Sequence, residues 1–245
     1  HPILSVLAAI FASYDLGEVA GRKASVYVGV HSFTKRILPP GFRIGIQTEQ
    51  FFDADGRSLW GVQSRARILR QAWQYDALLD LSPLYRPAYA FLPGFLQRRL
   101  RFGPYVYPSH VPAFQPGDAG APLLFFGAVN PRRQKALDAL GKAVRVLPYG
   151  VYGDALTAEI AAAKGVLNLH FSEGVYTEYP RLLSALMHGK ALWSEPLAPP
   201  LIAGRHCLRL EDAEQADGRA AYDACAREFA QAHQLRDFLA VALAA

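Results

Sequence analysis

The chain has 245 residues, of which 51% are hydrophobic and 19% are charged, and its formal net charge is +5. This composition supplies enough apolar side chains for one large or two modest packed domains, and it excludes an intrinsically disordered chain. The basic surplus is mild, and no zinc-finger, RNA-binding or basic-helix motif accompanies it, so nucleic acid is not expected as a partner. Phosphate groups of a small ligand, or an anionic membrane surface, account for the surplus equally well.

Targeting and metal signals are weak. The apolar run over residues 3–13 is shorter than the roughly 20 residues that span a bilayer, and it lacks the flanks of a signal peptide. We therefore expect a cytoplasmic protein, with peripheral association at the inner membrane as a further expectation. Cys207 and Cys225 are too few for a disulfide framework and are expected to be free thiols. Without a CxxC, an HExxH or a clustered set of ligand residues, no metal site is expected.

The first part of the chain predicts a small α/β lobe. Apolar periodicity indicates helices over residues 3–14 and 65–73, the latter burying Ile68, Leu69 and Ala72, and a weaker helix over residues 94–100. Alternating Val, Ile and Tyr residues predict strands over residues 25–30, 42–48 and 76–81. The chain starts at His1, so we expect this lobe to be incomplete.

A proline-rich stretch separates the first part from the second. Residues 105–122 contain Pro108, Pro112, Pro116 and Pro122 with two glycines, a composition typical of an interdomain linker. The predicted domains are residues 1–115 and residues 116–245.

The second part alternates strands with helices of about ten residues. Strands are predicted over residues 123–126, 143–147, 165–170, 191–194 and 208–210, and helices over residues 132–140, 155–164, 179–188 and 220–243. This alternation predicts a parallel sheet with helices on both faces.

Three loops of the second part follow predicted strands, where ligands of such sheets bind. In the first, Gly127 allows close approach of a ligand, Asn130 precedes the helix, and Arg132 and Arg133 stand at its N-terminus. Arginine is unfavourable there unless an anion is near, so the alternatives are a phosphate contact and a solvated helix start. In the second loop, Tyr149 and Tyr152 either frame an aromatic base or belong to a turn in which Asp154 caps the next helix.

The third loop is the most informative. His170 ends a strand, Glu173 lies in the loop, and Glu178 and Arg181 flank the start of a helix. Glu178 and Arg181 are three residues apart and can pair with each other. Alternatively, Glu178 accepts hydrogen bonds from ribose hydroxyls while Arg181 binds a diphosphate.

These loops carry a family resemblance. The runs 126–133, 149–153, 166–170 and 178–195 resemble, in order and spacing, the donor-binding lobe of bacterial GT-B glycosyltransferases, above all the CgeB-like, group 1-related set. The resemblance covers residues 120–200 and implies two Rossmann-like lobes that hold a nucleotide-diphosphate sugar. In such enzymes a glutamate stands five residues before the glycine that matches Gly189. Here that residue is Ser184, so we assign the ribose contact to Glu178.

The resemblance implies transfer of a sugar from a nucleotide-diphosphate donor to a glycan or lipid-linked acceptor such as a surface polysaccharide, without a metal-binding DxD motif in the donor lobe. The first lobe is then the acceptor side. If the reaction inverts the anomeric centre, a base is required, and the candidates are His31, Glu49 and His110. If it retains configuration, no base is required, and the sequence leaves this open. Asp53-Ala-Asp55 is interpreted as a solvated turn.

Two other functions fit the same residues. A nucleotide-sugar epimerase would need carboxylates around the sugar, for which Glu173, Glu178 and Glu195 are candidates. A non-catalytic nucleotide-sugar-binding module fits Ser184 and the short first lobe. The predicted donor contacts are Gly127, Asn130, Arg132, Tyr152, His170, Glu173, Glu178 and Arg181.

Overall fold

The computed structural model describes residues 2–12, 24–29, 38, 40–48, 65–174, 176–213 and 217–244. The chain divides into two compact units. The first-sheet unit comprises Tyr14–Val106 and His233–Ala245, and the second-sheet unit comprises His1–Ser13 and Tyr107–Ala232. Each unit is built from two segments of the chain, whereas the sequence interpretation treats each lobe as one continuous segment.

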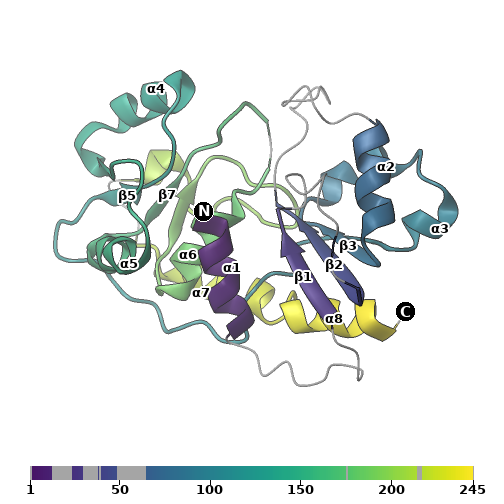
Figure 1. The fold of residues 1–245 in the computed structure, drawn as a ribbon. Helices are drawn as coiled ribbons and strands as arrows, with labels where there is room; N and C mark the ends of the chain where they lie inside the picture. The colour runs from purple at the N-terminus through teal and green to yellow at the C-terminus, as the bar shows by residue number, and fades with distance from the viewer. Residues whose placement is uncertain are drawn as a thin grey trace. The chain divides into compact units, whose positions relative to one another are not determined.

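The first-sheet unit contains four parallel strands in the order of the sequence (Figure 1). They are β1 (Ala24–Val28), β2 (Phe42–Gln47), β3 (Ala77–Asp80) and β4 (Leu100–Phe102). The register places Tyr27, Gly45, Leu78 and Leu100 side by side in one row across the sheet. Two residues further toward the carboxyl ends, on the same face, a row contains Gln47, Asp80 and Phe102.

Three helical elements pack against this face: α2 (Arg65–Gln74), the 3-10 helix η3 (Pro83–Tyr89) and α3 (Gly94–Gln97). Ile68 and Ala72 of α2 are buried as predicted, but Leu69 is 39% exposed. The prediction for Leu69 is wrong because only one narrow stripe of this short helix meets the sheet. The predicted helix over residues 94–100 ends at Gln97, because Leu100 and Phe102 belong to strand β4 and their side chains lie on the same face of the sheet.

The second-sheet unit contains four parallel strands in the order β6-β5-β7-β8. They are β5 (Leu123–Phe125), β6 (Val144–Val146), β7 (Val166–Asn168) and β8 (Leu192–Ser194). The chain leaves β5 toward one side of the sheet to form β6, then returns past β5 to form β7. The strand order therefore reverses between β5 and β7, which is the position where open α/β sheets bind ligands.

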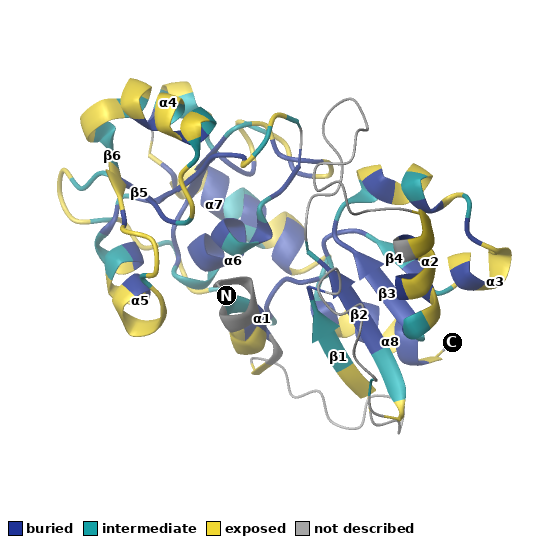
Figure 2. Cartoon of the chain, turned by 45° about the horizontal axis from the view of Figure 1, so that its top comes forward, coloured by how far each residue is buried: buried dark blue, intermediate teal, exposed yellow. Residues whose placement is uncertain are grey.

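The α-helices that the structure describes in this unit are α1 (Pro2–Ala12), α4 (Pro131–Leu140), α5 (Gly153–Ala162), α6 (Tyr179–Met187) and α7 (Arg219–Cys225). Helix α1 packs against α6, with Leu7 and Ile10 fully buried. Both cysteines are buried and free, as predicted. Figure 2 shows the strands of the second sheet largely buried and the outer surfaces of α4 and α5 exposed.

Two predictions near the C-terminus are wrong. Residues 208–210 form no strand; Leu208 makes an isolated bridge to Trp193, and the chain then turns through the 3-10 helix η5 (Leu210–Asp212). The predicted helix over residues 220–243 is interrupted. Helix α7 passes into a π-helical turn, η6 (Ala226–Ala230), and α8 (Leu235–Ala244) follows separately. The break coincides with the passage of the chain from one unit to the other, because residues from His233 onward pack with the first sheet.

The fold class is mixed α/β with two Rossmann-like lobes, as the sequence predicts. Within the described residues, no helix combines the length and the apolar character needed to cross a membrane.

Candidate functional site

The candidate site lies at the carboxyl edge of the second sheet, where the strand order reverses. Beyond β5 the chain continues through Phe126 and Gly127, and beyond β7 through Leu169 and His170. Helices α4 and α6 begin after these two strands. The guanidinium groups of Arg133 from α4 and Arg181 from α6 bind the backbone of both strand ends.

Arg133 joins the β5 and β7 loops. Its Nη1 donates to the carbonyl oxygen of Ala128 at 2.7 Å, and its Nε and Nη2 donate to that of Leu169 at 3.0 and 2.8 Å. The side chain is 3% exposed and lies over the rings of Phe125 and Phe171. A buried arginine with this many acceptors holds two loops at a defined distance.

Arg181 makes similar contacts from the opposite side. Its Nε donates to the carbonyl oxygen of Phe126 at 2.9 Å, and its Nη1 donates to Oδ1 of Asn168 at 3.1 Å. Gly127 has a φ of +117°, and a Cβ there would lie 2.8 Å from Nη2 of Arg181. Glycine is therefore required at 127, because any side chain would strain the backbone and collide with the guanidinium.

Glu178 is the common acceptor of this cluster. Its carboxylate pairs with Arg133 and Arg181, and also accepts from the hydroxyl of Tyr176 at 2.8 Å and the backbone N–H of Phe171 at 3.0 Å. The sequence left two alternatives for Glu178 and Arg181, and the structure contains the ion pair. Their contacts with ribose and diphosphate stay predictions.

Arg132 and Glu195 form a second ion pair beside the first. Nη1 of Arg132 donates to Oε2 of Glu195 at 3.0 Å and to the carbonyl oxygen of His170 at 2.9 Å, and Nη2 pairs with Oε1. Glu195 also accepts from the backbone N–H of His170 at 2.6 Å. Each arginine at the N-terminus of α4 thus pairs with a carboxylate of the protein, Arg132 with Glu195 and Arg133 with Glu178, and Glu178 is shared with Arg181.

Asn130 caps α4. Its Oδ1 accepts from the backbone N–H of Arg133 at 2.9 Å, and its Nδ2 donates to the carbonyl oxygen of Phe171 at 2.6 Å. The amide therefore fixes both the helix start and the neighbouring loop. His170 is 1% exposed, stacks on Tyr176 at a centroid distance of 4.3 Å, and approaches the carbonyl oxygen of Pro196 through Nε2 at 2.8 Å.

Burial changes the pKa values of several side chains in this cluster. It lowers the pKa of Arg133 to about 10, and burial together with repulsion from Arg133 lowers the pKa of Arg181 to about 9. Both remain cations at neutral pH. Burial also lowers the pKa of His170, so its ring is neutral. Burial acts to raise the pKa of Glu195, but hydrogen bonds from Arg132 and from the His170 backbone outweigh it and lower that pKa.

The accessible groups at this edge differ from the buried ones. Tyr149 is 77% exposed, Tyr152 is 42% exposed and Phe171 is 38% exposed, and Glu173 is also exposed. Tyr152 is the residue before α5, and Asp154 lies in the first turn of that helix rather than at its cap. The structure thus places all eight predicted donor residues on loops or helix starts of one sheet edge.

The candidate bases are not assembled here. His31 and Glu49, like Asp53 and Asp55, lie outside the described residues. His110 is exposed and belongs to the second-sheet unit, although the sequence assigns it to the first lobe. Among the described residues, no group of three or more His, Cys, Asp or Glu side chains could hold a metal ion.

Three members of the cluster were absent from the predicted donor contacts: Arg133, Tyr176 and Glu195. The sequence had singled out Arg133 beside Arg132 at the helix start, and Glu195 as a carboxylate of the epimerase alternative, without predicting that each pairs within this cluster. Tyr176 carries no comparable signal, since its partners follow from the loop conformation.

The two Rossmann-like lobes give the chain an architecture of the GT-B type. Among solved structures, the crystal structure of TarM, a glycosyltransferase, matches this chain with a TM-score of 0.51 at 11% identity. The match covers 96% of this chain and 57% of TarM, so the chain spans little more than half of that protein's length. At this identity the likeness establishes the fold, and it does not single out the CgeB-like group. No protein-family model matches the chain. No curated protein matches it either.

Proposed function

We propose that the chain is a glycosyltransferase that binds a nucleotide-diphosphate sugar at the carboxyl edge of its second sheet. The observation that carries the proposal is the cationic cluster at the β5–β7 reversal, in a fold shared with TarM. Helices α4, α5 and α6 all begin at this edge, and helix N-termini attract phosphate through their free N–H groups.

The charge balance of the cluster favours an anionic ligand. It contains three arginines, Arg132, Arg133 and Arg181, and two carboxylates, Glu178 and Glu195. Among these five groups one positive charge is in excess, with the exposed carboxylate of Glu173 at the same edge, and the five groups lie in a poorly hydrated region where electrostatic interactions are strong. Such a preorganised charge stabilises a diphosphate as the bond to the sugar breaks.

The three arginines differ in how far their side chains are exposed, and we assign them different roles accordingly. The side chain of Arg132 is 30% exposed and can contact a phosphate directly. Those of Arg133 and Arg181 are 3% and 5% exposed, so we propose that they act through their electrostatic field and by holding the loops that contain Gly127 and His170. Tyr149 and Tyr152 offer exposed rings for the base, and Glu173 is accessible to the ribose or the sugar.

The test combines binding with turnover. We expect one of the UDP, GDP, CMP and ADP sugars to raise the melting temperature and to release free nucleotide during incubation. Arg132→Gln is expected to weaken nucleotide binding about tenfold, the usual effect of losing one charge-assisted hydrogen bond. Arg145→Gln, which removes an exposed cation on β6, is the matched control and should leave the affinity unchanged.

The outcomes separate the competing functions. Protection against heat without nucleotide release would support a non-catalytic binding module, and conversion of the sugar while the nucleotide stays attached would support an epimerase. If none of the nucleotide sugars protects the protein, the proposal is wrong.

We further propose that transfer needs no divalent cation held by the protein, because the arginines and helix N-termini already offset the charge of the leaving group. Turnover measured in excess EDTA should equal turnover with added magnesium or manganese. Activity that EDTA abolishes and the metal restores would contradict this part of the proposal.

A further inference from the structure

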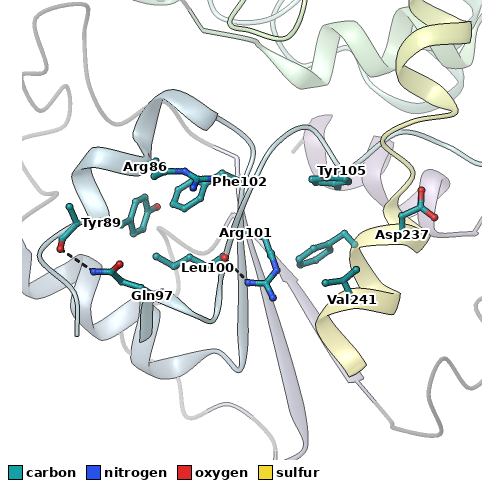
Figure 3. A pocket seen from close by; sticks show the side chains of 11 residues that line it. Arg86, Tyr89, Gln97, Leu100, Arg101, Phe102, Tyr105, Asp237 and Val241 are labelled. Carbon is teal, nitrogen blue, oxygen red and sulfur yellow. Dashed lines mark hydrogen bonds between the residues drawn. The ribbon is translucent and has the colours of Figure 1, made fainter. Parts of the chain in front are cut away.

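A groove in the first-sheet unit runs along β4, remote in sequence from the donor edge. Its volume is about 690 Å³, and it lies between η3 and α3 on one side and α8 on the other (Figure 3). Its lining residues all belong to the first-sheet unit, so it exists within one compact body. The volume is within the range of roughly 300–1,000 Å³ typical of small-ligand sites.

β4 ends the strand order of its sheet, so in the described part of the chain no strand covers its outer side. Nη1 of Arg101 donates to the carbonyl oxygens of Leu100 and Arg98, at 2.9 and 2.8 Å. The guanidinium thus occupies the carbonyl oxygen of Leu100, one of the β4 groups through which another strand would add, and a charged side chain on an edge strand opposes such pairing. The groove is therefore suited to a ligand other than an extended peptide.

Two cations line the groove. The guanidinium of Arg86 lies 5.1 Å from the ring centroid of Phe102, and Arg101 lines the same groove from β4. Neither guanidinium forms a salt bridge to a carboxylate within the described residues. Two arginines in one groove, with no paired carboxylate, attract an anionic ligand.

Aromatic rings form the apolar part of the lining. Phe102 is held by an edge-to-face contact with Tyr89, at a centroid distance of 5.4 Å, and the hydroxyl of Tyr89 donates to Asp80 at 2.6 Å. Tyr105 and Phe238 line the groove from the other side. Because the guanidinium of Arg86 lies over one face of Phe102, the ring surface that suits the C–H faces of sugar rings is the remaining part of Phe102 together with Tyr105.

Hydroxyl-binding groups complete the lining. Asp237, in the first turn of α8, is exposed in the groove and can accept hydrogen bonds from hydroxyls. Nε2 of Gln97 donates to the carbonyl oxygens of Leu92 and Ala90, at 2.7 and 3.1 Å, which holds the amide in place. A carboxylate that lines the same groove as two arginines disfavours a densely charged polyphosphate and favours a ligand whose acidic groups alternate with hydroxyls.

We propose that this groove binds an acidic glycan, with Arg86 and Arg101 contacting its acidic groups and Phe102 and Tyr105 contacting its sugar rings. A second statement rests on the proposed transferase function: if that function holds, the acceptor of the enzyme is an acidic glycan. The acidic group is a carboxylate or a phosphate, since arginine binds both in the same way.

The test is a titration without any nucleotide. The probes are a fluorescent hexamer of galacturonic acid, its fully methyl-esterified neutral form, and a mannose oligosaccharide of the same length with phosphate esters. We expect the acidic probes to bind at least tenfold more tightly than the neutral one. The tighter of the two acidic probes identifies the acidic group.

Variants locate the binding. Arg86→Gln and Arg101→Gln are each expected to weaken binding of the acidic probe about tenfold, because each removes charge-assisted hydrogen bonds. Arg70→Gln, at an exposed position of α2 in the same unit, is the matched control and should change nothing. Arg86 is exposed, so its variant tests the groove even if Arg101→Gln impairs folding.

Three results would overturn the inference. The neutral probe could bind as tightly as the acidic ones, Arg70→Gln could weaken binding as much as the groove variants do, or a single-stranded oligonucleotide could bind more tightly than the acidic glycans. Nucleotide affinity of the same variants should stay at the wild-type level. Failure of the glycan titration with intact nucleotide release would refute the groove alone, whereas glycan binding without nucleotide release would refute the transferase proposal alone.

Discussion

The two sheets have the same number of strands and the same parallel direction, but their strand orders differ. In the first sheet each strand lies beside its neighbour in sequence, whereas in the second β5 lies between β6 and β7. The loops after β5 and β7 therefore leave toward opposite faces, and the buried side chains of Arg133 and Arg181 bind both strand ends. Strand order thus decides where a buried charged cluster can form.

The acids of the two sheets show the consequence. Glu178 and Glu195 in the second unit are paired with arginines. Asp80 at the carboxyl end of β3 is 2% exposed, and it accepts from the hydroxyl of Tyr89 at 2.6 Å and the backbone N–H of Ser82 at 2.9 Å. Burial raises its pKa to about 7, in spite of these two hydrogen bonds. In the second unit the hydrogen bonds to Glu195 outweigh its burial and lower its pKa, whereas in the first unit burial raises the pKa of Asp80.

The largest effect is expected for Glu178→Gln. Removing its charge leaves Arg133 and Arg181 buried without their carboxylate, which typically costs about 3–5 kcal/mol. Urea denaturation measures the free energy of unfolding. Glu159→Gln breaks the exposed pair with Arg145 and serves as control, with an expected loss below about 1 kcal/mol. Equal losses in the two variants would show that the cluster contributes no more than a surface ion pair.

The next largest effect is the pH dependence of the free energy of unfolding, to which the two sheets contribute with opposite signs. Asp80 takes up its proton at about pH 7 when folded and near 3.8 when unfolded. Between these values the unfolded chain binds fewer protons, so the free energy of unfolding falls as pH rises from about 4 to about 7, by roughly 1.4 kcal/mol per unit of pKa shift. Glu195 has a pKa lowered from 4.5, so its contribution is present above pH 4.5 and is lost as pH falls below it.

Two variants separate these contributions in denaturation curves recorded from pH 3 to pH 8. In Asp80→Asn, the free energy of unfolding is expected to change less between pH 4 and pH 7 than in the wild type. In Glu195→Gln, the decrease of that free energy at acidic pH is expected to be smaller. An unchanged slope in Asp80→Asn would mean that another group titrates there.

A smaller effect is expected for Gly165→Ala at the start of β7. A Cβ at this position would lie 2.2 Å from Cζ3 of Trp193, whose side chain is fully buried, and 2.8 Å from the carbonyl oxygen of Ala191. Overpacking of this kind costs about 1–3 kcal/mol. Gly94→Ala in α3 meets no atom within 4 Å, and is expected to leave stability unchanged or raise it by up to about 1 kcal/mol. Thermal denaturation of both variants tests the difference.

The smallest effect on stability, within about 0.5 kcal/mol, is expected for Tyr152→Ala, because its side chain is 42% exposed. Its effect on nucleotide affinity should be larger, about 1–3 kcal/mol, if the ring stacks on the base. Trp73→Ala removes an exposed aromatic residue from the first-sheet unit and should leave that affinity unchanged. Calorimetry measures the nucleotide affinity of both variants. If Tyr152→Ala and Trp73→Ala lose affinity equally, or if neither loses any, Tyr152 does not belong to the binding site.

The sequence alone predicted most helices and strands, because apolar periodicity and terminal glycines are local properties of the chain. The helices α4, α5 and α6 and the strands β5, β7 and β8 all match predicted ranges closely. β4 could not be predicted as a strand. The predicted helix over residues 94–100 included Leu100, and only the pairing of Leu100–Phe102 with β3 makes these residues extended.

The predicted donor residues were found by their position after strands, and the structure has them at one edge of the second sheet. What the tertiary structure alone decided is how they pair. Glu178 meets Arg133 across 45 positions of sequence and Glu195 meets Arg132 across 63, distances over which no local pattern acts. The sequence determined which loops carry charge, since strand ends and helix starts are encoded locally. The strand order, a property of the whole sheet, determined which of those charges are buried together.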